Sequence, residues 1–185
     1  MINDTLNEAE QKMDKAVEVT REDFAAIRTG RAHPQMFHKL TADYYGSPTP
    51  LQQLASFTVP EARVIIIAPF DQSSMTAIEK AIRDSDLGVN PTDDGKTIRV
   101  VLPELTEERR KEYIKLAKGK AEDGRVAIRN VRRHAKQALE RLEKDGEVSK
   151  DDVTGAEKRL DGLTKKHTDA VDELLKHKEA ELMEV

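Results

Sequence analysis

Cysteine and tryptophan are absent from this sequence of 185 residues, and only 4% of its residues are aromatic. Without cysteine there is no disulfide, no thiolate zinc site and no cysteine nucleophile. No apolar run approaches the roughly 18 residues that span a bilayer, and the first residues lack the basic and apolar regions of a signal peptide. These absences predict a soluble, cytoplasmic protein without a membrane partner.

Charge, by contrast, is abundant and unevenly spread. Asp, Glu, Lys and Arg make up 36% of the residues, against roughly 25% in an ordinary globular domain, which favours long helices with a large surface. The formal net charge is −4, yet residues 109–136 hold eleven Lys and Arg against three acids. Residues 1–27 and 137–185 are both acidic. One basic segment therefore lies inside an acidic protein.

Three segments have the periodicity of long amphipathic helices, with apolar residues at steps of three and four. The first covers residues 2–27, and the third begins at a capping box in residues 149–152. The second begins at the N-cap candidate Thr106 and reaches Lys144, a length of roughly 58 Å. Its predicted apolar stripe is Ile114, Ala117, Ala121, Gly124, Ile128, Val131, Ala135, Ala138 and Leu142. None of the helices buries its stripe alone, so we expect an antiparallel three-helix bundle.

The segment between the first two helices has a different character, since residues 31–104 hold all seven prolines. Strands are predicted at residues 40–44, 64–68 and 97–102, with a loop at 46–50 and a short helix after Asp71. We therefore predict an α+β protein of two domains. Residues 1–30 and 105–185 form a discontinuous bundle, and residues 31–104 form a small inserted β/α/β domain.

Two chain connections join these predicted domains. They lie near Gly30 and Arg31 and near Pro103, Glu104 and Leu105. Short paired connections allow a hinge motion, so these five residues are the hinge candidates.

The basic segment arranges its cations in a stripe of its own. Five cations follow a member of the apolar stripe by one position, about 100° around the helix: Lys118, Arg125, Arg129, Arg132 and Lys136. Arg133 lies within about 40° of Arg129, and Arg28 and Arg31 are candidates to extend the surface. Acids are scarce between residues 125 and 136, so we expect these cations to lack partners within the protein and to bind RNA phosphates. The alternative is a solvated helix face with salt bridges.

Candidate catalytic or metal-binding constellations are not found in the sequence. Residues 95–97 resemble the end of a phosphate-binding P-loop, but the glycine needed five residues earlier is Asn90. His167 falls on an apolar stripe and is predicted to be a hydrogen-bonded core histidine, whereas His33 and His38 are predicted to be surface residues. We therefore expect that this protein is not an enzyme and that it binds no metal and no cofactor.

Several blocks of the sequence resemble the bacterial ribosome recycling factors. The blocks are residues 27–32 (IRTGRA), 44–51 (YYGSPTPL), 79–82 (EKAI) with 85–91 (SDLGVNP), 105–111 (LTEERRK) and 126–133 (VAIRNVRR). They are collinear and extend over nearly the whole chain. Two positions depart from the family pattern: His134 stands where Asp is common, and His33 stands where Ser is common.

The resemblance implies an L-shaped arrangement of the two domains and binding of the bundle to the large ribosomal subunit and its RNA. It also implies cooperation with elongation factor G and GTP in dissociating the post-termination ribosome, while the factor itself hydrolyses nothing. We further expect a monomer. From the residues alone, two other functions stay open: an adaptor that recognises an acidic partner protein through a helix face, and a phosphate-handling enzyme, for which no catalytic constellation is present.

Overall fold

The structure, a computed structural model, describes residues 1–184 in two compact units. The first unit consists of Met1–Phe24 and Lys115–Glu179, and the second consists of Ala25–Ile114 and the residues from Ala180 onward. The predicted domain boundaries at residues 30 and 105 stay a prediction. None of the helices in the described residues combines the length and the hydropathy needed to cross a membrane.

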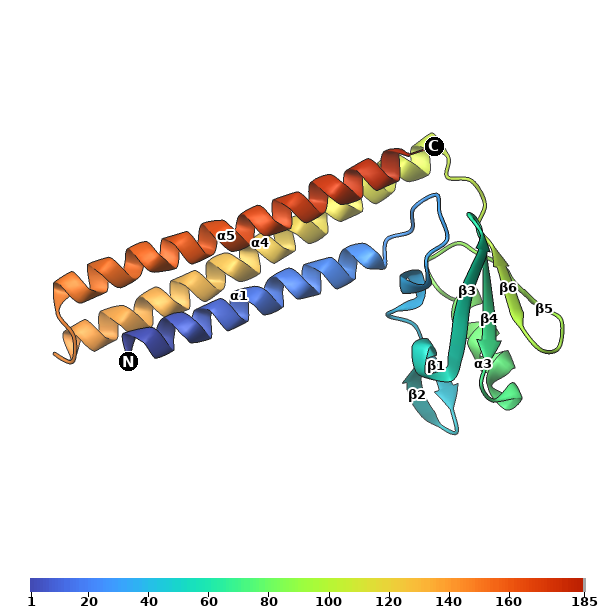
Figure 1. Cartoon of the computed structure of the whole chain (residues 1–185), viewed down its shortest axis with the longest axis horizontal. Helices are drawn as coiled ribbons and strands as arrows, with labels where there is room; N and C mark the ends of the chain where they lie inside the picture. The colour runs from blue at the N-terminus through green and yellow to red at the C-terminus, as the bar shows by residue number, and fades with distance from the viewer. Residues whose placement is uncertain (185) are drawn as a thin grey trace. The chain divides into compact units, whose positions relative to one another are not determined.

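Three long helices form a bundle, as predicted: α1 (Ile2–Ala25), α4 (Glu107–Lys144) and α5 (Lys150–Met183) (Figure 1). Cross-helix contacts fix their directions. Asn3 and Asp14 of α1 meet Arg159 and His167 of α5 in the same order, so these two helices are parallel. Arg125 and Arg132 of α4 meet Asp172 and Asp161 of α5 in the reverse order, so α4 runs antiparallel to α5.

Side-chain caps explain where the last two helices begin. Thr106 Oγ1 accepts a hydrogen bond from the Arg109 backbone N–H at 3.1 Å. Ser149 Oγ accepts from the Asp152 N–H at 3.0 Å, and Asp152 Oδ2 accepts from the Ser149 N–H at 3.4 Å. These bonds satisfy backbone donors that the first turn of a helix leaves without partners. Both predicted helix starts are confirmed.

The buried side of α4 agrees with the predicted stripe except near its end. Ala135 is buried, as expected, but the next core residue is Leu139, which is 0% exposed, and not Ala138, which is exposed. Alternating steps of three and four average 3.5 residues per turn, slightly less than the 3.6 residues of an α-helix. The predicted stripe therefore lags behind the buried side a little more with each turn, and a second step of four, from Ala135 to Leu139, corrects it. The stripe therefore drifts, and the strict alternation of steps was wrong at this point.

α1 and α4 approach each other closely where Thr20 meets Gly124. A Cβ atom placed on Gly124 would lie 2.3 Å from Thr20 Oγ1. Thr20 is 2% exposed, and its hydroxyl donates to the Ala16 carbonyl at 2.9 Å. Glycine is thus favoured at this helix crossing, because even an alanine methyl group would require the Thr20 side chain to move.

His167 lies inside the bundle, as predicted, with 3% of its surface exposed. Its Nδ1 is 2.7 Å from the Leu163 carbonyl oxygen, and its Nε2 is 2.6 Å from Asp14 Oδ1. Both ring nitrogens therefore have polar partners, which a buried imidazole requires.

The second unit contains two antiparallel sheets. One pairs β1 (Thr41–Tyr44) with β2 (Ser47–Pro50), and the other has the order β3 (Ala55–Glu61), β4 (Val64–Pro69), β6 (Ile98–Val101), β5 (Pro91–Asp93). Four short helices complete it: η1 (Pro34–Phe37), α2 (Leu51–Leu54), η2 (Gln72–Ser74) and α3 (Met75–Arg83). Phe37, Ile65, Ile78 and Ile98 are fully buried in a shared apolar core. The inserted sheet domain is confirmed.

The turn or loop predicted at residues 46–50 is wrong for residues 47–50, which form strand β2. The turn is confined to Tyr45 and Gly46, which have φ angles of 52° and 83°. Pro48 and Pro50 lack a backbone N–H but pair with Asp43 and Thr41 of β1. β2 pairs only with β1 and is therefore an edge strand, a position in which a proline without a backbone N–H is tolerated.

Candidate nucleic-acid interface on the bundle

Six predicted phosphate-binding cations lie on one helix, α4, within the first unit. They are Lys118, Arg125, Arg129, Arg132, Arg133 and Lys136. From Lys118 to Lys136 the helix rises about 27 Å. Their spacing places them along one side of the helix, beside the buried stripe that holds Ile128 and Ala135. Helix geometry alone therefore brings these six cations together.

Arg125 is fully engaged inside the bundle. Its Nε and Nη2 lie 2.8 and 2.7 Å from Asp172 Oδ1 on α5, and its Nη1 donates to Glu122 Oε2 at 3.1 Å. Only 22% of its side chain is exposed. The position thus joins α4 to α5, which is a structural role.

Arg129 and Arg132 are partly engaged. Arg132 Nε donates to Asp161 Oδ1 of α5 at 2.8 Å, and Arg129 Nη1 donates to Glu122 Oε1 at 3.2 Å. The Arg132 side chain is 39% exposed, and the Arg129 side chain is 57% exposed. Hydrogen bonds from Arg125 and Arg129 hold the pKa of Glu122 below its usual value, so this carboxylate stays charged beside them.

The expectation that these cations lack partners within the protein is therefore wrong for Arg125, Arg129 and Arg132. Two of the carboxylates come from α5, about 30 to 50 positions later in the sequence. The third, Glu122, lies seven residues before Arg129, nearly two helical turns away. A search for acids between residues 125 and 136 sees none of them. The two pairs with α5 are revealed only by the packing of α4 against α5, whereas Glu122 lies three residues before Arg125 on the same helix, a spacing that the sequence itself contains.

A cationic surface remains after these pairs are counted. Within residues 1–184, no ion pair involves Lys118, Arg133 or Lys136, and Arg133 and Lys118 are exposed. Arg129 and Arg132 each use one guanidinium nitrogen and keep further N–H donors. The outward part of the stripe therefore still offers donors that suit phosphate oxygens.

Arg28 and Arg31 belong to the second unit and differ from each other. Arg28 is 5% exposed, its Nη2 donates to the Pro103 carbonyl, and burial lowers the pKa of its guanidinium. A contact between Arg28 and RNA would require the side chain to leave this position. Arg31 is exposed, and its backbone N–H donates to Thr29 Oγ1 at 3.3 Å.

The hinge candidates lie in chain without regular secondary structure. Gly30 and Arg31 follow α1, while Pro103, Glu104 and Leu105 lie between β6 and α4. Leu105 is 8% exposed and Glu104 lies 3.9 Å from Arg63. Their role as a hinge stays a prediction.

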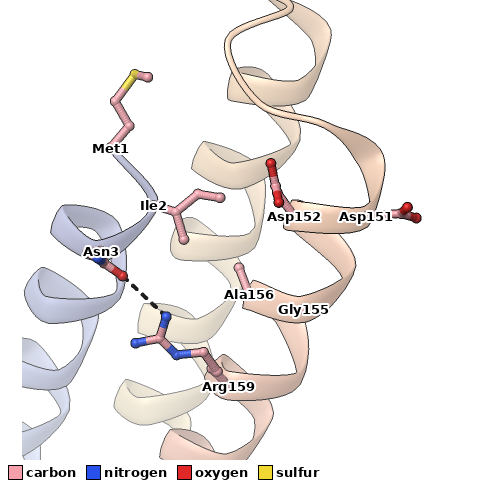
Figure 2. Close-up of a pocket in the computed structure, with 8 residues that line it drawn as sticks. All are labelled: Met1, Ile2, Asn3, Asp151, Asp152, Gly155, Ala156 and Arg159. Carbon is pink, nitrogen blue, oxygen red and sulfur yellow. Dashed lines mark hydrogen bonds between the residues drawn. The ribbon is translucent and has the colours of Figure 1, made fainter.

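A shallow pocket lies between the start of α1 and the start of α5 (Figure 2). Arg159 Nη1 donates to Asn3 Oδ1 at 3.2 Å across it, and Asp151 and Asp152 stand at its rim. Asp152 caps α5. No group of three potential metal ligands occurs in the part of the chain that the structure describes. The pocket is explained by helix starts and carries no chemistry of its own.

Comparisons with known proteins agree with this fold. The family described as ribosome recycling factor matches residues 20–183. The chain is 77% identical to the ribosome-recycling factor of Nocardioides sp. and 68% identical to that of Acidothermus cellulolyticus, in both cases over 100% of both chains. A solution structure of a ribosome recycling factor aligns with a TM-score of 0.79 and 44% identity, covering 100% of this chain and 98% of that one. With a family match over most of its length and relatives this similar, the chain belongs to the ribosome recycling factor family.

Proposed function

We propose that this protein binds the post-termination ribosome and, together with elongation factor G and GTP, promotes dissociation of the subunits for a new round of translation. A similar solved structure describes a Thermus thermophilus ribosome recycling factor and an elongation factor G bound to a post-termination complex; it has a TM-score of 0.70, is 40% identical and covers 100% of both chains. Family membership makes the protein a translation factor and not an enzyme. Its place of action would be the cytoplasm, where ribosomes are found.

The observation that carries the docking proposal is the cationic stripe of α4. The bundle would contact the large ribosomal subunit and its RNA through Arg129, Arg132, Arg133, Lys118 and Lys136. Phosphate oxygens would accept from the guanidinium donors that the protein leaves available. Arg125 would support the surface from inside, and Arg31 would add a contact from the second unit.

The three-helix bundle supplies stiffness, which the proposed role needs. A helix of 38 residues such as α4 is about 57 Å long, and packing against α1 and α5 keeps it from bending. If the GTPase pushes on the α/β unit, motion at residues 30–31 and 103–105 would transmit the force to the bundle. A flexible chain would dissipate the same force.

Disassembly of post-termination ribosomes tests the function directly. Subunit release is followed by light scattering with the protein, elongation factor G and GTP, and each component is omitted in turn. We expect release only when all three are present. Release at the same rate without this protein would refute the proposal.

The docking surface is tested with Arg132→Ala. Loss of a charge-assisted phosphate contact should weaken binding to purified large subunits roughly 10- to 150-fold, since such bonds contribute roughly 1.5–3 kcal/mol. Helix content, measured by circular dichroism, should not change because the side chain is half exposed. Arg21→Ala is the matched control: it also removes an exposed arginine paired with a nearby acid, Glu18, but on α1. Equal affinity of the Arg132 variant and the parent would exclude this docking surface.

A further inference from the structure

Two arginines of α4 meet a carboxylate of α5, but the pairs use the guanidinium differently. Arg125 uses all three nitrogens, with Asp172 at Nε and Nη2 and Glu122 at Nη1. Arg132 uses only Nε, which donates to Asp161 Oδ1 at 2.8 Å. Across the described chain, its Nη1 and Nη2 donate no hydrogen bond. The two terminal amino groups of Arg132 are therefore available to another acceptor.

The contact at Nε also determines where those amino groups lie. A guanidinium is planar, so an acceptor bound at one edge fixes the plane and the side-chain rotamer together. Asp161 comes from α5, which packs against α4, and so the bundle holds its backbone beside Arg132. Arg132 is 39% exposed against 22% for Arg125. Its terminal amino groups thus belong to a side chain that is ordered but still accessible.

We propose that Asp161 is a positioning residue for the contact between Arg132 and an RNA phosphate. It holds Nε, so the pair of terminal amino groups is preorganised for phosphate oxygens, which such a fork binds with two parallel hydrogen bonds. This inference rests on the proposed function. The neighbouring pair, Arg125 with Asp172, joins the helices and does not contact RNA.

Asp161 has a second effect, which opposes the first. Its negative charge repels the phosphate that Arg132 binds. The carboxylate is 58% exposed, however, and the high dielectric constant of the surrounding water weakens this repulsion. An arginine without a partner loses much rotamer freedom when it binds, and this loss weakens affinity. We therefore expect ordering to outweigh repulsion, so that removal of this acid weakens binding to RNA.

The direction in which the affinity changes when Asp161 is removed tests this proposal. Purified large ribosomal subunits are titrated with the parent protein, Asp161→Ala, Asp161→Asn and Asp172→Ala. Asp161→Ala should bind three- to tenfold more weakly, although the variant is less negative. Asp161→Asn keeps an acceptor oxygen for Nε and should recover most of the affinity. Asp172→Ala removes the same charge from the same helix and should bind as tightly as the parent or more tightly.

A double-mutant cycle separates positioning from folding and from general charge. In the Arg132→Ala background, Asp161→Ala should cause no further loss of affinity, because the side chain that it orients is absent. Thermal unfolding is measured for every variant, and Asp161→Ser repeats the test if the alanine variant does not fold. Ser is too short to hold Nε, so the same three- to tenfold loss is expected.

The proposal is overturned if Asp161→Ala binds as tightly as the parent, or if its loss persists without Arg132. Failure of the proposed function is a different result, in which the parent itself does not bind large subunits. If the parent binds, Arg132→Ala weakens binding and Asp161→Ala does not, only the positioning role is lost.

Discussion

At the scale of single residues, Asp71 shows how much one carboxylate contributes to the second unit. Its Oδ1 accepts from the hydroxyl of Ser73 at 2.8 Å and from the Ser73 backbone N–H at 2.9 Å, which caps η2. Its Oδ2 accepts from the hydroxyls of Tyr44 and Tyr45 at 3.1 and 3.4 Å. These bonds, that from the Ser73 side chain first, lower the pKa of Asp71 below its usual value.

The lowered pKa predicts a dependence of stability on pH. An ionised Asp71 stabilises the folded protein above its unfolded-state pKa, near 3.9, and this stabilisation is lost as the pH falls through the lower folded-state value. Asp71→Asn should therefore be less stable than the parent at pH 6, and the difference should shrink toward pH 2. Urea unfolding between pH 2 and 6 measures it. A difference that stays constant over this range would contradict the assignment.

At the scale of helices, the contact between α1 and α4 depends on the absence of a side chain at Gly124. Gly124→Ala should destabilise the protein by about 1–3 kcal/mol, the usual effect of inserting a methyl group into a packed core. Gly119 is the control, because a Cβ there meets nothing within 4 Å and it lies on the same helix. Gly119→Ala should stabilise by up to about 1 kcal/mol.

Thermal or urea unfolding of both variants checks this prediction. Thr20→Ala removes the hydroxyl that the new methyl group would meet, so the double variant should recover part of the lost stability. If Gly124→Ala proves as stable as Gly119→Ala, the close helix approach is not present in solution.

The elements that the sequence predicted well are those with local signals. Long helices repeat their apolar pattern many times, and Thr106 and Ser149 mark where two of them begin. β3 and β5 were not predicted, since β3 holds only two β-branched residues among seven and β5 is very short. β5 holds only Pro91–Asp93, and it is a strand because β6 pairs with it. For such elements, tertiary pairing decides the structure.

The candidate surface was likewise predicted only in part. Helical spacing was enough to place the six cations of α4 on one side. Their partners on α5, Asp161 and Asp172, were not predictable, because the facing register of two helices is set by packing. Arg28 was taken as a surface cation, while its burial depends on the path of the chain near Pro103.

At the scale of the whole molecule, the protein combines a net charge of −4 with one cationic helix side. Binding to large subunits should therefore depend strongly on salt although the protein is acidic. Three to five phosphate contacts, each releasing roughly 0.7–0.9 counterion, predict a slope of log affinity against log salt of about −2 to −4. Titrations over a range of KCl concentrations at constant Mg²⁺ measure this slope.

Arg133→Ala should reduce the magnitude of the slope by roughly 0.7–0.9, the contribution of one phosphate contact. Arg125→Ala should leave the slope unchanged, because carboxylates already neutralise that guanidinium. A slope near zero for the parent would indicate that apolar contacts, and not phosphates, dominate the association.

The order of helices in the bundle also constrains how the protein is made. Asp14 of α1 bonds His167 of α5, 153 residues later in the chain, and Asn3 bonds Arg159 across 156 residues. Contacts so distant in sequence form late, after the intervening chain exists. During synthesis α1 therefore emerges with its apolar stripe uncovered, and the second of its two partner helices, α5, follows only after α4. A protein that we propose acts on ribosomes thus completes its bundle only after α5 has emerged from the ribosome that makes it.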